Sequence, residues 1–105
     1  YESIIQQHVG DSKLYDFNST LDYPVLRSKD GGVFVQEVIE AYQAVGVQAE
    51  PQIIGGGSDA NFFAAEGFNA AIVGVGMQQV HTTEEYLEID QLLLTTEMLV
   101  HYLTQ

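Results

Sequence analysis

The segment Gly55–Asp59 combines three consecutive glycines with two small polar side chains and is the first candidate for a ligand site. Glycines let the backbone come close to a ligand, and the free N–H groups at the start of a following helix favour an anion. Ser58 adds a hydroxyl, and Asp59 is suited to capping that helix. The Lys of a phosphate-binding loop and the pattern G-x-G-x-x-G of a dinucleotide site are both missing. The segment therefore predicts either a small-anion site or an ordinary glycine-rich turn between a strand and a helix.

His81 is the second candidate, because it follows closely on the apolar run at residues 69–76. In parallel sheets, ligand sites gather at the carboxyl ends of the strands, so we expect His81 and the glycine-rich segment to share one pocket. The alternative is an ordinary surface histidine in a loop, where Thr82 and Glu85 match a capping box and simply start a turn. His8 and His101 have no partner at metal-ligand spacing, and we interpret both as surface residues.

The elements that position these segments alternate between helix and strand from residue 33 onward. The hydrophobic spacing predicts a helix at 33–45 with Asp30 as a cap, a strand at 48–54, a helix at 60–66, a strand at 69–76, and a helix at 91–104 capped by Asp90. The run at 69–76 lacks alternation, which is typical of a strand buried on both faces. This order predicts an α/β layered fold in which strands 48–54 and 69–76 are parallel neighbours.

The N-terminal part is expected to be a separate structural unit. Residues 1–9 predict the end of a helix closed by Gly10, and residues 13–22 predict a strand that pairs with another chain or folds back. The stretch 23–32 is rich in turn-forming residues and is interpreted as a domain boundary. The start Tyr1-Glu2-Ser3 has neither an initiator Met nor a basic signal-peptide start, so we expect a piece of a longer protein.

Composition excludes several classes of partner. The chain has 105 residues, with three Lys and Arg against fifteen Asp and Glu, which gives a net charge of −12. Nucleic-acid binding needs clustered Lys and Arg, so we expect no nucleic-acid partner, and binding to an anionic membrane surface is disfavoured for the same reason. No apolar run approaches the ~20 residues of a membrane span. Cysteine is absent, which leaves no disulfide or thiolate site and fits the cytoplasmic location that we expect.

Three stretches, taken in order and spacing, resemble a known family. Residues 56–62 (GGSDANF), 67–76 (GFNAAIVGVG) and 80–86 (VHTTEEY) are similar to the C-terminal part of the dinuclear-zinc metallopeptidases. That family includes peptidase T, glutamate carboxypeptidase, aminoacylase and succinyl-diaminopimelate desuccinylase, and the similarity is greatest to the peptidase T-like tripeptidase branch. The resemblance implies that residues 25–105 are the C-terminal segment of a three-layer α/β catalytic domain. Residues 1–24 would be the last helix and strand of a ferredoxin-like lid that mediates homodimerisation.

The same resemblance implies roles for particular residues. His81 matches the family's last zinc ligand, in a site that holds two zinc ions. Gly56, Gly57 and Ser58 match the loop that holds a carboxylate or carbonyl oxygen of the substrate. The implied reaction is hydrolysis of a small peptide or an N-acyl amino acid by water that a metal and a Glu activate.

The sequence also departs from the family pattern. The H-x-D motif and the Glu-Glu pair of the family are absent, and Glu84-Glu85 does not correspond to that pair. One imidazole cannot hold a catalytic zinc, which typically has three protein ligands. We therefore expect no catalytic residue in this chain, no activity of the chain alone, and dependence on the N-terminal remainder of the same polypeptide. The alternative function is a non-catalytic acidic α/β module that binds a small anion at Gly55–Asp59 or mediates assembly; it would bind nucleotide without metal.

Overall fold

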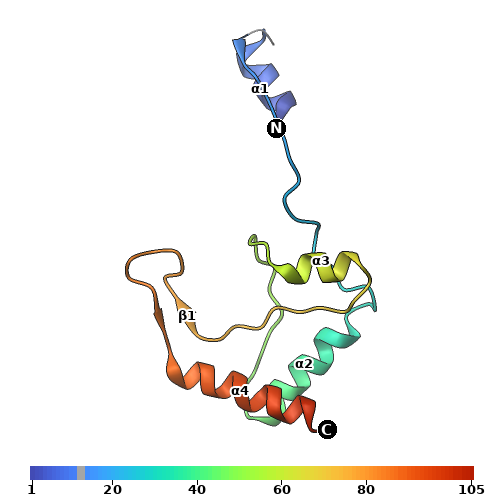
Figure 1. Ribbon diagram of the computed structural model, residues 1–105, viewed down its shortest axis with the longest axis vertical. Helices are drawn as coiled ribbons and strands as arrows, with labels where there is room; N and C mark the ends of the chain where they lie inside the picture. The colour runs from blue at the N-terminus through green and yellow to red at the C-terminus, as the bar shows by residue number, and fades with distance from the viewer. Residues whose placement is uncertain (12–13) are drawn as a thin grey trace.

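The computed structural model describes residues 1–11 and 14–105, which form helices and one short hairpin (Figure 1). The elements in chain order are α1 (Glu2–Val9), α2 (Val33–Ala44), α3 (Asp59–Ala65), β1 (Met77–Gln78), β2 (Tyr86–Leu87) and α4 (Ile89–Leu103). This mixture of helices with a small two-stranded sheet is compatible with the α/β class. None of the helices in the described residues has the length and apolar character that a membrane span requires.

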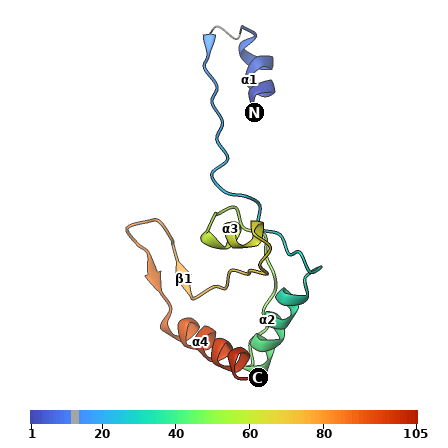
Figure 2. The same cartoon turned by 45° about the vertical axis from the view of Figure 1, so that its right-hand side comes forward.

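The molecule is extended rather than compact. Its radius of gyration is 19.3 Å, whereas a compact domain of about this length has roughly 13 Å. Helix α1 stands apart from the other elements, at the far end of an extended connection (Figures 1 and 2). The other helices lie around the segments that connect them, with α2 packed against α4. The buried hydrophobic residues among those described are few, namely Ala41, Ala64 and Met98.

Local capping explains where the first two helices begin and end. Helix α1 ends at Gly10, which has φ 75°, as expected. The predicted helix at 33–45 is confirmed as α2. Gly32 and not Asp30 occupies the cap position, but the Asp30 carboxylate accepts hydrogen bonds from the N–H groups of Gly32 and Phe34, both at 2.9 Å. Gly46, with φ 82°, follows the helix and closes it.

Two predicted caps need correction. The cap of α3 is Ser58 rather than Asp59: its hydroxyl accepts from the N–H of Ala60 at 3.2 Å, while Asn61 accepts from the N–H of Ser58 at 3.0 Å. Asp59 lies in the first turn instead. Helix α4 begins at Ile89, so Asp90 also lies in the first turn and is not the cap. In both cases a carboxylate inside the first turn still favours the positive end of the helix dipole.

The predicted strands are wrong for the described residues. Neither 48–54 nor 69–76 is a β-strand, and residues 14–22, the described part of the third prediction, are not a strand either. Lys13 lies outside the described residues. A strand requires a hydrogen-bonded neighbour, and the described part of the chain gives these segments none. Burial nevertheless alternates along 45–50 and 71–75, so one face of each segment is covered and the other is open. The run at 69–76 is thus not buried on both faces.

Helices α2 and α4 hold the second of these segments through a buried hydroxyl. Thr95, on α4, is buried and donates a hydrogen bond to the carbonyl oxygen of Gly74 at 2.8 Å. The Tyr42 hydroxyl, on α2, lies 3.3 Å from the same Thr95 oxygen. These bonds connect both helices to the segment that leads to β1, and therefore to the hairpin.

Candidate functional site

The glycine-rich loop leads directly into α3 and is held by residues from the N-terminal half of the chain. The amide of Asn61, which is buried, donates to the carbonyl oxygen of Pro24 at 2.7 Å. The ring of Tyr23 lies against Gly57 so closely that a Cβ on Gly57 would be 2.5 Å from a ring carbon. That ring also lies 5.6 Å from the ring of Phe62 between centroids. Glycine is therefore required at position 57 because the Tyr23 ring occupies the space of a side chain.

A cavity of about 470 Å³ opens beside this loop. Its lining combines the glycines with apolar residues and two amide side chains, namely Tyr23, Pro24, Val25, Leu26, Gln52, Ile53, Ile54, Gly55, Gly56, Gly57, Asn61 and Ile72. His81 is not part of that lining, so a pocket shared by His81 and the loop stays a prediction. The sequence interpretation missed Tyr23 and Asn61. The spacing of Ser58 and Asn61 was the available sign, because a side chain three residues after a Ser cap can bond back to it.

Some backbone N–H donors of the glycine-rich loop already make hydrogen bonds within the chain. The N–H groups of Ser58 and Ala60 already donate to Asn61 and Ser58, which leaves fewer donors for a free anion. The hydroxyl of Ser58 accepts in this arrangement, and its own proton stays available for an acceptor oxygen. The loop is thus better suited to one oriented oxygen than to a phosphate group that many N–H groups surround.

His81 lies in the loop of the β1–β2 hairpin, which joins Met77 to Leu87 in antiparallel register. Residues 79–85 of this loop are all exposed. The N–H of His81 donates to Oε2 of Glu85 at 2.8 Å, while the imidazole makes no hydrogen bond to another described residue. Thr82 Oγ1 accepts from the N–H of Glu84 at 3.2 Å. The predicted turn is therefore present, and the N–H of Glu85 donates to the carbonyl oxygen of Thr82 at 3.3 Å, but the Glu85 carboxylate bonds to the N–H of His81 and not to that of Thr82.

The base of the hairpin is fixed against α4. Gly76 has φ 88°, and its carbonyl oxygen accepts from the N–H of Glu88 at 2.9 Å. A Cβ at position 76 would lie 2.6 Å from Cβ of Gln91 and 2.8 Å from the carbonyl oxygen of Glu88. The chain can make this close approach only with glycine. The hairpin loop is therefore carried by a base that packs tightly on the first turn of α4.

The residues present fit one ligand of a metal site and not a complete one. Within the described residues, no group of three or more His, Asp or Glu side chains could hold a metal ion. His81 has the chemistry of a zinc ligand and an exposed, unengaged ring, so it suits a site whose other ligands come from elsewhere. His8 is exposed, and its Nδ1 lies 2.8 Å from the carbonyl oxygen of Ile4. His101 is half-buried on α4 rather than exposed.

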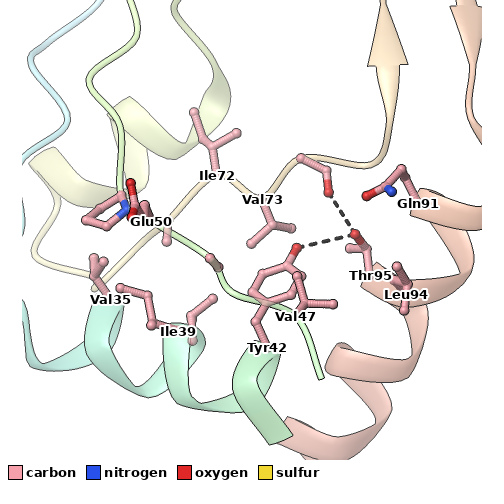
Figure 3. Close-up of a pocket in the computed structure, with 15 residues that line it drawn as sticks. Val35, Ile39, Tyr42, Val47, Glu50, Ile72, Val73, Gln91, Leu94 and Thr95 are labelled. Carbon is pink, nitrogen blue, oxygen red and sulfur yellow. Dashed lines mark hydrogen bonds between the residues drawn. The ribbon is translucent and has the colours of Figure 1, made fainter. Parts of the chain in front are cut away.

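A second cavity, of about 260 Å³, lies between α2, α4 and the two extended segments (Figure 3). Apolar side chains dominate its lining, among them Val35, Ile39, Val47, Val73 and Leu94. Figure 3 shows these side chains converging from both helices and both segments, with Thr95 bonded to Tyr42 and Gly74. This cavity has the character of an incompletely filled packing layer and offers no acid, base or metal ligand beyond Glu50.

Comparison with known proteins gives a consistent result. A sequence model described as "Peptidase family M20/M25/M40" matches residues 5–105. A curated relative, "Uncharacterized protein YqjE" of Bacillus subtilis (strain 168), is 38% identical over 78 residues. The aligned part covers 74% of this chain but 21% of the relative, so the chain spans about a fifth of that protein's length. No solved structure matches significantly.

Proposed function

Because the chain belongs to peptidase family M20/M25/M40, we propose that it is the C-terminal part of a zinc-dependent exopeptidase or amidohydrolase. The substrate class is a small peptide or an N-acyl amino acid. His81 supplies one zinc ligand, and Gly56, Gly57 and Ser58 contact the substrate. The other ligands and the general base belong to the N-terminal remainder of the same polypeptide. On this proposal, residues 1–24 belong to a lid through which the protein forms a homodimer in the cytoplasm.

The observation that carries the proposal is the state of His81. Its imidazole is exposed and unengaged by described residues, while its backbone N–H is bonded to Glu85 at 2.8 Å. The backbone bond restricts where the ring can lie, and both ring nitrogens stay open to a metal ion and to a second partner from the remainder of the polypeptide.

Exposed apolar surface supports dependence on further polypeptide. Ile53 is fully exposed, while Ile54 and Ile72 are 60% and 46% exposed, and all three lie on or beside the extended segments. Isolated exposed apolar residues are common, but a contiguous group beside unpaired backbone is typical of an interface. Additional strands could pair with the unpaired backbone of 45–50 and 71–75, and additional helices could cover their open faces.

The chain's own residues have three tasks in this mechanism. His81 would hold one zinc ion through an unprotonated ring nitrogen, and zinc supplies Lewis-acid polarisation of the scissile carbonyl. Ser58 would donate its hydroxyl proton to a substrate carboxylate or carbonyl oxygen, since that hydroxyl already accepts from Ala60. Gly56 and Gly57 would let the substrate approach the backbone closely, and the Tyr23 ring packs against Gly57 where a Cβ would lie.

The test is a pair of histidine variants in the full-length protein. His81→Ala should lower the zinc content and abolish most hydrolysis of peptide or N-acyl substrates, while the circular dichroism spectrum stays unchanged. His101→Ala is the control, because His101 lies on α4 away from the hairpin loop. Metal content and activity that respond equally to the two substitutions would show that His81 is not a ligand.

The alternative is a non-catalytic module that binds a small anion at Gly55–Asp59. A binding measurement without metal distinguishes it from the proposed zinc-dependent hydrolase. Calorimetric titration of inorganic phosphate or nucleotide into chelator-treated protein should give no binding if the zinc proposal holds. Binding that Ser58→Ala weakens would favour the alternative.

A further inference from the structure

The backbone of the hairpin loop is held in an uncommon conformation at two positions. Gln79 has φ 50° and His81 has φ 67°. Side chains other than glycine rarely adopt positive φ, and they stay there only when the surroundings fix them. The candidate ligand His81 is therefore one of the two non-glycine residues with positive φ in the described part of the chain.

Glu85 is the group that fixes His81. Its Oε2 accepts the N–H of His81 at 2.8 Å, across four residues of the loop. The acceptor is a carboxylate, and such charge-assisted bonds are about twice as strong as neutral ones. The imidazole has no hydrogen-bond partner among the described residues, so the conformation of the backbone at His81 is what restricts the directions in which the ring can point.

The other loop bonds do not replace this contact. Thr82 Oγ1 donates to the carbonyl oxygen of Gln79 at 2.7 Å and accepts from the N–H of Glu84 at 3.2 Å. Both bonds shape the loop around His81 without touching it. Glu84 is exposed and charged like Glu85. Its side chain, however, has no hydrogen bond to a described residue, which makes Glu84 a matched control.

We propose that Glu85 is a positioning residue, which locks the left-handed backbone of His81 and so aims the imidazole for metal binding. This inference rests on the proposed role of His81 as a zinc ligand. It gives Glu85 a function through its backbone contact and not as a ligand itself. Glutamine at position 85 separates the two roles, because an amide oxygen accepts the same N–H bond but is a poor substitute for a carboxylate ligand of zinc.

The experiment compares Glu85→Ala, Glu85→Gln and the matched control Glu84→Ala in the full-length protein. Zinc affinity is measured by competition with a chromogenic chelator, and hydrogen exchange of the His81 amide is measured in the metal-free protein. Glu85→Ala should weaken zinc binding by about 10–100-fold, the usual range for groups that orient a metal ligand, and should speed exchange at His81. Glu85→Gln should retain most of the affinity and most of the protection, and Glu84→Ala should match the unsubstituted protein.

Each outcome decides the proposal. Glu85→Ala that behaves like Glu84→Ala in either measurement overturns it, and so does faster exchange with unchanged zinc affinity. If Glu85→Gln loses as much zinc affinity as Glu85→Ala, Glu85 is itself a ligand, and the positioning role is wrong. If His81→Ala leaves zinc affinity unchanged, the proposed function fails on its own account. In that case, hydrogen exchange of the His81 amide in the Glu85 variants still tests whether Glu85 fixes the backbone.

Discussion

Gly76 connects the segment 71–75 to the hairpin, and substituting it tests how the hairpin is attached to α4. Alanine at this position would keep φ near 88° and place its Cβ 2.6 Å from Cβ of Gln91 and 2.8 Å from the carbonyl oxygen of Glu88. The backbone cannot simply withdraw, because the Gly76 carbonyl accepts from the N–H of Glu88 at 2.9 Å. Positive φ costs a non-glycine residue about 1–2 kcal/mol and overpacking about 1–3 kcal/mol, so Gly76→Ala should lower the free energy of unfolding by about 2–5 kcal/mol.

Two other glycines separate these contributions. Gly67 has φ 103° but open space where a Cβ would lie, so Gly67→Ala should show the backbone cost alone, about 1–2 kcal/mol. Gly74 has open space and no positive φ, so Gly74→Ala should change the free energy of unfolding by less than about 0.5 kcal/mol. The assay is urea unfolding of the full-length protein, with the three variants compared at the same protein and zinc concentrations.

The order of the three urea midpoints decides the argument. Equal midpoints for Gly76→Ala and Gly74→Ala would refute the close packing of the hairpin base on α4. Equal midpoints for Gly76→Ala and Gly67→Ala would support the cost of the positive φ but contradict the steric contact with Gln91 and Glu88. Gly76→Ala should also lower zinc affinity, because the same base carries the loop with His81.

Two further substitutions test the supports of the site. Thr95→Val removes the hydrogen bond to the Gly74 carbonyl and leaves that acceptor unpaired, so the free energy of unfolding should fall by about 1–3 kcal/mol. Thr96→Val is the control, because Thr96 lies at an exposed position of the same helix and its loss should cost less. Thermal unfolding compares the two variants. The Ser28 hydroxyl and the N–H of Phe34 hold the pKa of the Asp30 carboxyl below its ordinary value of 3.8. This carboxylate therefore stabilises the start of α2 above pH 3.8, and that contribution should be lost as the pH falls through the lowered pKa. Asp30→Asn should make amide exchange at Phe34 independent of this acid transition, and an unchanged transition would contradict the assignment.

Local interactions explain which elements the sequence predicted correctly. Helix α2 and the end of α1 depend on hydrogen bonds between near neighbours and on glycines such as Gly10 and Gly46, so their spacing is visible in the sequence. The cap of α3 was misassigned because Ser58 and Asp59 are both good capping residues. The reciprocal bond from Asn61 decides between them: the spacing of Ser58 and Asn61 permits it, and the structure shows that it forms.

Non-local interactions explain what the sequence could not predict for this chain. The segments 48–54 and 69–76 have the composition of strands, and burial alternates in 71–75. Hydrogen-bonded ladders need partners from outside each segment, and the described residues do not provide them. The close approach of Tyr23 to Gly57 is likewise a contact between distant parts of the chain that no local pattern indicates.

The candidate site combines local and non-local interactions. Each half of the candidate site has its own supports within this chain: Asn61 and Tyr23 hold the glycine-rich loop, while Glu85 and Gly76 hold the loop with His81. The spacing between the halves depends on the segments that precede them, which are covered on one face along 45–50 and 71–75 and are exposed along 51–54. Adjacent strands in a sheet lie about 4.8 Å apart, so completing the sheet would fix that spacing to within the tolerance that substrate and metal require. If the proposed function holds, catalysis should therefore appear only with the remainder of the polypeptide.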